Sequence, residues 1–263
     1  YFKSFGIDMD RVIHTPITDV EQLKFDITNQ LNDLTKNDNV CIVIDSIGNL
    51  ASKKEVDDAL DGKSVADMSR AKQMKSLFRI VTPHLNLKDI PLICVNHTYK
   101  EISMFPKDIV SGGTGAYYSA DAIWIIGRRQ EKEGQEIKGY HFVVNIEKSR
   151  HVREKSAIPI TVTFDGGIMK WSGLLEVAEK AGFIHKPKVG WYEALNPETG
   201  EVLTEKLMRA KEIVDNKDFW LMMFEKTGLA KHIEKVYTIA SSAGLINDDT
   251  QIEIADEEIV AND

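Results

Sequence analysis

Two short apolar runs in this chain end in polar side chains that could contact a nucleotide. The first, Cys41 to Ile44, leads into Asp45 and Ser46, and the second, Leu92 to Asn96, leads into His97. A carboxylate beside a hydroxyl can organise Mg²⁺ on phosphate oxygens, and a nearby histidine could sense the phosphate. The alternative is two buried strands of an α/β protein with no site at their ends.

The elements that would position these groups alternate between strand and helix. Each run has the form of a short strand that is apolar on both faces, and the carboxyl ends of such strands meet at the ligand crevice of an open sheet. Apolar residues at helical spacing fall in two segments: Val20, Leu23, Ile27 and Leu31, and then Met68, Ala71, Met74, Leu77, Phe78 and Val81. The polar residues 47–63 and 98–114 predict loops.

The second half of the chain has a different pattern. Residues 122–127 and 140–147 predict the two strands of a hairpin, and residues 158–164 predict a third strand, before the chain turns helical from Ser172. The fold class is therefore α/β, with a mostly parallel central sheet, antiparallel edge strands and a small helical C-terminal subdomain.

This pattern predicts three parts in the chain. Residues 1–171 form the core, 172–246 the small C-terminal subdomain, and 247–263 a flexible tail with seven acidic residues and no basic one. The net charge of −8 argues against a uniformly basic nucleic-acid coat but leaves a local basic channel open.

The cysteines and the lengths of the apolar runs indicate the cellular compartment. Cys41 and Cys94 both fall in apolar strands, so we expect buried thiols and a reducing, cytoplasmic environment. No apolar run reaches the roughly 18 residues of a membrane helix, and no signal peptide is visible. The chain starts at Tyr1 without Met, with a Gly6 typical of a helix end, which suggests a fragment.

Three further motifs each allow two interpretations. Gly62 to Ser64 matches the end of a phosphate-loop motif, but Asp57 stands where the motif needs its first glycine. We therefore interpret it as a chance match and not as a phosphate loop. Ser111 to Gly115 could bind phosphate through backbone N–H groups or act as a hinge. Lys148 to Arg150 could face one anion or form a solvated basic patch.

Together these pieces resemble the RecA family of strand-exchange recombinases, and most closely its UvsX-type branch in T-even bacteriophages. The stretches that carry the resemblance are Cys41–Ser52, Ser69–Pro83, Val95–Tyr99, Ser111–Gly115, Asn145–Ser156 and Phe164–Leu175. The resemblance implies a RecA-like ATPase core. It also implies an ATP- and Mg²⁺-dependent DNA recombinase that forms filaments on single-stranded DNA and catalyses homologous pairing and strand exchange in recombination, repair and replication.

The resemblance also implies roles for individual residues at the nucleotide. Asp45, with Ser46, looks like the acid of the Mg²⁺-organising strand. His97 stands where the family usually has a glutamine that senses the γ-phosphate, and Tyr1 matches the tyrosine that stacks on adenine. Trp171 matches an aromatic residue that closes over the adenine from the next subunit.

Two cations are expected to act across the subunit interface. Lys148 and Arg150 match residues that reach a neighbour's nucleotide and stabilise charge on its γ-phosphate. The family's phosphate loop and catalytic glutamate precede the position of Tyr1, so we expect these residues alone neither to hydrolyse ATP nor to build a stable filament.

The resemblance implies two DNA-binding loops, at about 53–66 and 98–114. The candidate contacts are phosphate-neutralising lysines, backbone amides and a base wedge: Lys63, Lys100, Lys107, Gly112, Gly113, and Met104 or Phe105. Expected partners are single- and double-stranded DNA, further copies of the protein in a helical filament, and single-strand-binding and mediator proteins, in the host bacterial cytoplasm. The alternatives are a non-catalytic truncated paralogue that modulates recombinase filaments and, with less support, a helicase-type motor.

Overall fold

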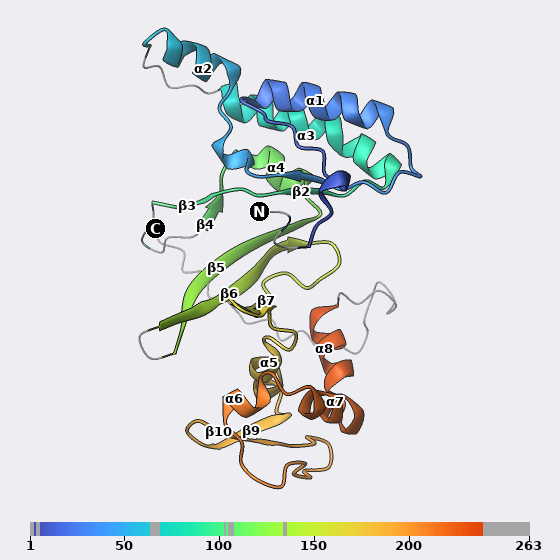
Figure 1. Ribbon diagram of the computed structural model, residues 1–263, viewed down its shortest axis with the longest axis vertical. Coiled ribbons are helices and arrows are strands. Elements are labelled where there is room, and N and C mark those ends of the chain that lie inside the picture. Colours follow the sequence, from blue (N-terminus) through green and yellow to red (C-terminus); the bar gives the residue numbers. More distant parts are fainter. Residues whose placement is uncertain are drawn as a thin grey trace, which may run out of the picture. The chain divides into compact units, whose positions relative to one another are not determined.

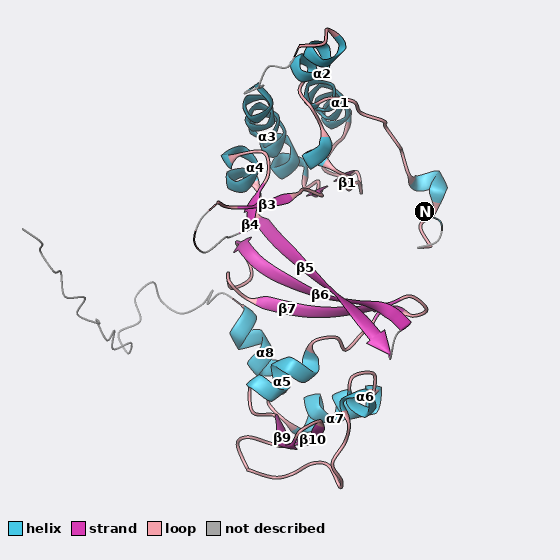
Figure 2. Ribbon diagram, turned by 90° about the vertical axis from the view of Figure 1, so that its left-hand side faces the viewer, coloured by secondary structure: helices cyan, strands magenta, loops and turns pink. Residues whose placement is uncertain are grey.

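The computed structural model describes residues 3, 6–63, 69–102, 104, 108–133 and 136–238, and it divides the chain into two compact units, 1–125 and 126–263 (Figures 1 and 2). Tyr1, Phe105, Lys107 and the acidic tail lie outside the described residues. The predicted boundary after residue 171 stays a prediction. No helix in the described part of the chain is long and apolar enough to cross a membrane.

The first unit combines helices with short strands. Its elements are the 3₁₀ turns η2 (Met9–Arg11) and η3 (Ile47–Asn49), helices α1 (Val20–Asp33), α2 (Lys53–Leu60), α3 (Ser69–Lys88) and α4 (Thr114–Ser119), and strands β1 (Ile42–Ile44), β2 (Leu92–Cys94), β3 (Thr98–Lys100) and β4 (Asp108–Val110). β1 pairs with β2 in parallel, and β3 pairs with β4 antiparallel.

Helices α1 and α3 form the core of this unit with one side of the β1–β2 pair. The predicted stripe of α1 is confirmed, since Val20, Leu23, Ile27 and Leu31 are all buried. They pack in one cluster with Met74, Leu77, Phe78 and Val81 of α3 and with Ile44 of β1. Each such side chain contributes roughly 1.5–3 kcal/mol on burial, so this cluster fixes the strand that ends at Asp45.

The other side of the β1–β2 pair is exposed, which differs from the prediction of strands buried on both faces. Val43 is 60% exposed and Ile93 is 55% exposed, although both are apolar. Cys41, predicted to be buried, precedes β1 and is exposed, whereas burial raises the pKa of the Cys94 thiol to about 11. In the described residues, helices cover only one face of this pair, and the apolar sequence alone could not indicate that.

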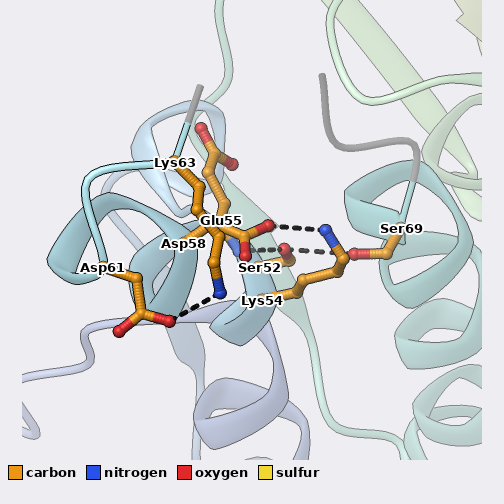
Figure 3. A network of polar contacts seen from close by, with 7 residues as sticks. All are labelled: Ser52, Lys54, Glu55, Asp58, Asp61, Lys63 and Ser69. Carbon is orange, nitrogen blue, oxygen red and sulfur yellow. Dashed lines mark hydrogen bonds and ion pairs between the residues drawn. The ribbon is translucent and has the colours of Figure 1, made fainter. Parts of the chain in front are cut away.

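The predicted loop at 47–63 contains a helix, α2, so this part of the prediction is wrong. Ser52 caps the helix by accepting a hydrogen bond from the Glu55 backbone N–H at 3.1 Å. Lys54 and Asp58 form an ion pair one turn apart, at 2.6 Å (Figure 3). No residue of α2 is buried, so the apolar stripe by which a helix is normally found is missing here.

The second unit holds an antiparallel sheet followed by a smaller α/β part. Its elements are β5 (Ala122–Glu133, which begins in the first unit), β6 (Glu136–Ser149), β7 (Ala157–Thr163), β8 (Gly167–Ile168), α5 (Leu174–Lys180), β9 (Ile184–Lys188), β10 (Trp191–Ala194), α6 (Ala210–Ile213), α7 (Lys217–Lys226) and α8 (Leu229–Tyr237). The sheet order is β5-β6-β7-β8, and β9 pairs antiparallel with β10.

The α/β class is confirmed, but a mostly parallel central sheet is not what the described residues form. Among the described strands, β1 and β2 pair in parallel, whereas β3–β4, β6–β7, β7–β8 and β9–β10 pair antiparallel. The predicted helical C-terminal part also contains the β9–β10 hairpin, because Tyr192 and Ala194 are buried against the same cluster as Trp220 and Met223 of α7.

Candidate functional site

The ends of β1 and β2 bring two of the predicted nucleotide residues together. The β1–β2 register pairs Ile44 with Cys94, so both strands end at the same edge. Ser46 Oγ lies 3.4 Å from His97 Nε2, and the tautomer of the imidazole decides which of the two donates. Asp45, one residue before Ser46, is exposed at this edge, and the Asp45–Ser46 peptide bond is cis.

Backbone hydrogen bonds continue the β1–β2 pairing into the turn after Asp45. The Val95 N–H donates to the Ile44 carbonyl at 2.9 Å, and the Ile47 N–H donates to the Val95 carbonyl at 3.0 Å. Ile47 is buried in the core cluster. The segment between them, which carries Asp45 and Ser46, is therefore attached to the core at both ends.

His97 is also tied to the far end of the 98–114 segment. Asn96 Nδ2 donates to the Ser111 carbonyl at 2.8 Å, and the Ser111 N–H donates to the His97 carbonyl at 2.9 Å. The segment was predicted to be a loop, but its ends form the β3–β4 hairpin, with Tyr99 paired with Ile109. His97 and Ser111 therefore close the base of this hairpin.

Gly112 and Gly113 follow β4 in conformations that favour glycine. Their φ angles are +92° and +77°, and Gly113 precedes the first residue of α4. Gly115 is needed for a different reason, since a Cβ there would lie 2.7 Å from the Lys75 Cα of α3. The glycines of the 111–115 motif therefore have structural roles here, and their predicted contact with DNA stays a prediction.

The two described lysines that were predicted to contact DNA are both in ion pairs. Lys63 Nζ lies 2.8 Å from an Asp61 carboxylate oxygen (Figure 3), and Lys100 Nζ lies 2.9 Å from Asp108 across the hairpin. Both pairs are solvent-exposed. Met104, the described candidate for a base wedge, is 88% exposed.

Lys148 and Arg150 lie in the second unit, where β6 ends. Ser149 between them accepts hydrogen bonds from the backbone N–H groups of His151 and Val152, at 3.1 and 3.0 Å, which makes a tight turn. Lys148 is half-buried and Arg150 is exposed. The turn therefore separates the two cations by one residue, and their predicted contact with an anion stays a prediction.

Trp171 lies at the edge of a cavity within the second unit. Its ring centroid is 6.3 Å from that of Phe224, and Lys170 Nζ lies 4.9 Å from the centre of the indole. The cavity, of about 480 Å³, is also lined by His141 and Tyr192. Trp171 therefore packs partly on the hydrophobic core, and its predicted contact with adenine stays a prediction.

Two residues at the strand ends were missed by sequence reasoning. Arg70 of α3 donates from Nε to the Leu50 carbonyl at 2.6 Å, and from Nη2 to the carbonyls of Ile47 and Gly48 at 3.1 and 3.0 Å. A Cβ on Gly48 would lie 2.1 Å from His97 Cδ2. No spacing rule finds such contacts, because they join residues 20 or more positions apart.

A protein metal centre built from several ligands is not found in the described residues. Within them, no group of three or more His, Cys, Asp or Glu side chains could hold a metal ion. A Mg²⁺ ion bound with a nucleotide needs only one or two carboxylates, because phosphate and water supply its other ligands. A single carboxylate such as that of Asp45 fits this kind of donor set.

Known proteins resemble the chain over most of its length. The recombination and repair protein of Enterobacteria phage T4 is 49% identical over 99% of this chain, which covers 66% of the T4 protein. Protein RecA of Tropheryma whipplei is 26% identical over 73% of the chain, and Protein RecA of Aquifex aeolicus is 23% identical over 83%. The chain spans 43% and 63% of the lengths of these two RecA proteins.

The C-terminal part has a match of its own. Residues 171–233 match the family described as the C-terminal domain of the bacteriophage T4 recombination and repair protein. The resemblance stated from the sequence is thus confirmed. The chain belongs to the RecA family, in the UvsX-like branch of phage recombination and repair proteins, and it is a partial chain relative to these relatives.

Proposed function

We propose that the protein carrying this chain is an ATP-dependent DNA recombinase that forms filaments on single-stranded DNA and catalyses homologous pairing and strand exchange. The observation that carries the proposal is the meeting of Asp45-Ser46 and His97 at one edge of a parallel strand pair, with 3.4 Å between Ser46 and His97. This is the edge at which α/β folds bind ligands, and it occurs in a chain 49% identical to a phage recombination and repair protein.

Asp45 and Ser46 would hold the Mg²⁺ that accompanies ATP, and this ion would neutralise charge on the phosphates. His97 would hydrogen-bond the γ-phosphate and, through Asn96 and Ser111, transmit its presence to the 98–114 segment. Tyr1 would stack on the adenine. The core that holds these residues would be RecA-like, as the family membership suggests.

The nucleotide would lie between subunits. Lys148 and Arg150, at the turn after β6, would contact the γ-phosphate of the neighbouring subunit, and Trp171 would close over that subunit's adenine. A head-to-tail contact of this kind repeats to give a helical filament. The phosphate loop and catalytic glutamate would come from outside these 263 residues, which span 66% of the T4 relative.

Single-stranded DNA would bind to the segments 53–66 and 98–114 without sequence preference. Lys63, Lys100 and Lys107 would exchange carboxylate partners or water for phosphates, and the amides of Gly112 and Gly113 would contact the backbone. Met104 or Phe105 would wedge between bases. Residues 172–246 would form a separate subdomain, and the acidic tail 247–263 would restrain DNA uptake.

A second candidate is a non-catalytic paralogue that modulates recombinase filaments. Within these residues the partial phosphate-loop match at Gly62 to Ser64 has Asp57 in place of the first glycine, so it would supply no phosphate cradle of its own. Such a protein would still carry the interface cations Lys148 and Arg150.

The two candidates differ in ATP hydrolysis by the whole protein. Under the first proposal, hydrolysis rises with single-stranded DNA, and Asp45→Asn lowers turnover by about 10²-fold or more through loss of a charge next to the phosphates. Unchanged hydrolysis in Asp45→Asn would refute the Mg²⁺ assignment. A whole protein that binds single-stranded DNA or filaments without hydrolysing ATP would favour the second candidate.

A further inference from the structure

The turn between β1 and α2 connects to both predicted DNA segments, and α3 holds it in place. The first segment leaves this turn at Ser52 and returns at Ser69, the first residue of α3. Ser52 is fully buried, and its Oγ lies 3.1 Å from Ser69 Oγ, so the two serines close the base of the 53–66 segment (Figure 3). Any rearrangement of that segment therefore acts on the start of α3.

Arg70 is the next residue of α3, and it makes the main polar contacts between α3 and the turn. Its half-buried guanidinium donates three hydrogen bonds, to the carbonyls of Ile47, Gly48 and Leu50. Hydrogen bonds from a charged donor are stronger than those between neutral groups. The planar guanidinium matches three carbonyls at once, which the ammonium of lysine cannot do in the same geometry.

Gly48 of this turn lies directly against the His97 side chain. A Cβ at this position would lie 2.1 Å from His97 Cδ2 and 3.0 Å from Asn96 Oδ1, so the imidazole rests directly against the Gly48 backbone. Its other ring contact in this region is with Ser46, which precedes the same turn. A shift of the turn by a few tenths of an ångström must therefore move the ring of His97.

We propose that Arg70 is a positioning residue that couples the 53–66 segment to His97 through the Ile47–Leu50 turn. The inference rests on the proposed function, because it gives the 53–66 segment its own connection to the phosphate-sensing side chain. Together with the Asn96–Ser111 contact, it makes His97 the point at which both segments meet. Arg70 on this account touches neither nucleotide nor DNA.

The test uses the whole protein and measures single-stranded DNA affinity with and without a non-hydrolysable ATP analogue. The ratio of the two affinities measures how far the analogue strengthens DNA binding. Arg70→Gln and Arg70→Lys should both reduce this ratio by roughly fivefold or more, which is the lower range of coupling between two sites. Affinity without nucleotide should stay within about twofold of wild type. Arg79→Gln, an exposed arginine on the same helix, is the matched control and should change neither value.

Two results would overturn the inference. If Arg70 contacted a DNA phosphate, Arg70→Lys would keep most of the affinity, and Arg70→Gln would weaken binding equally with and without nucleotide. If Arg70 only stabilised the fold, both variants would lower the melting temperature and leave the strengthening unchanged.

A second readout does not depend on nucleotide binding. The imidazole NMR signals of His97, assigned through His97→Gln, should shift in Arg70→Lys and in Gly48→Ala, while those of His185 in the second unit stay in place. Unshifted His97 signals in both variants would contradict the inference, even if the ATP analogue strengthens DNA binding by the wild type. If the wild type shows no effect of ATP, the proposed function fails, and these signals alone decide whether Arg70 positions His97.

Discussion

The two halves of the proposed nucleotide site are held in place by different means. Asp45 and His97 follow a parallel pair of only three residues per strand. Two side chains, those of Arg70 and Asn96, hold the segments that follow these strands. Lys148 belongs to β6, whose antiparallel pairing with β7 runs over seven residue pairs, from Gly139 to Asn145.

This difference determines how each half responds to mutation. Asp45 and His97 are held by side-chain hydrogen bonds and only a short backbone pairing. Removing one of these side chains should therefore move the residues of the site, as we expect for Arg70. Where the backbone ladder sets the position, removing a side chain takes away its charge and leaves the geometry intact.

The largest effect is expected from the double substitution Lys148→Ala and Arg150→Ala. An arginine finger contributes about 10³-fold or more to phosphoryl transfer, so ATP turnover should fall by about that factor while the melting temperature stays close to wild type. Lys155→Ala, in the same turn and paired with Glu147 at 2.8 Å, is the control. A loss of turnover below tenfold, or unfolding of the double variant, would contradict the account of this half.

The next largest effect concerns the two faces of the β1–β2 pair. Ile44→Ala removes a buried side chain and should lower the free energy of unfolding by about 2–5 kcal/mol. Val43→Ala, at the neighbouring position, should cost less than about 1 kcal/mol, because Val43 is 60% exposed. Urea denaturation of the two variants measures both values, and equal costs would show that the second face is covered in solution.

A smaller effect is expected in the DNA segments. Lys100→Ala should reduce the slope of log affinity against log salt by about 0.7, the contribution of one phosphate of single-stranded DNA. Asp108→Asn should instead raise affinity by about two- to threefold, because it frees Lys100 from an exposed ion pair worth at most about 1 kcal/mol. Binding of a fluorescent oligonucleotide at several salt concentrations measures the affinity and the salt slope of both variants. Weaker binding by Asp108→Asn would argue against Lys100 as a phosphate contact.

The smallest effect distinguishes the two cysteines. Cys41 is exposed and should react quickly with a thiol reagent at pH 8, whereas Cys94 should react only on unfolding. Burial raises the pKa of Cys94 from 9.0 to about 11. Below pH 9 the Cys94 thiol is therefore protonated in both the folded and the unfolded protein. Between pH 9 and 11 it loses its proton more readily in the unfolded protein, so the free energy of unfolding falls as the pH rises. Cys94→Ala should lose this part of the pH dependence, and equal reactivity of both thiols would contradict the burial of Cys94.

The sequence predicted those parts of the fold that have a clear apolar period. The stripe of α1 and the apolar residues of α3 were found because every third or fourth residue is buried. α2 was missed because its stability comes from a Ser52 cap and an ion pair rather than from burial. The exposed face at Val43 was missed because an apolar residue does not show whether anything covers it.

The candidate site was predictable only to the extent that strand ends carry it. Asp45 and His97 stand out because each follows an apolar run, and parallel pairing brings their strand ends to one edge. Arg70 could not be found in this way, since its role depends on three backbone carbonyls that any residue type would offer. Gly48 likewise has a meaning only once His97 is seen to lie against it.

The central claim, that one subunit supplies Asp45 and the next supplies Lys148 and Arg150, is tested most directly by mixing two inactive variants of the whole protein. In an equimolar mixture of Asp45→Asn with Lys148→Ala/Arg150→Ala, about a quarter of head-to-tail interfaces would combine an intact Asp45 with intact cations. The account predicts that DNA-stimulated ATP hydrolysis returns to about a quarter of the wild-type rate. A mixture that stays as inactive as its components, although the two variants co-assemble on DNA, would contradict it.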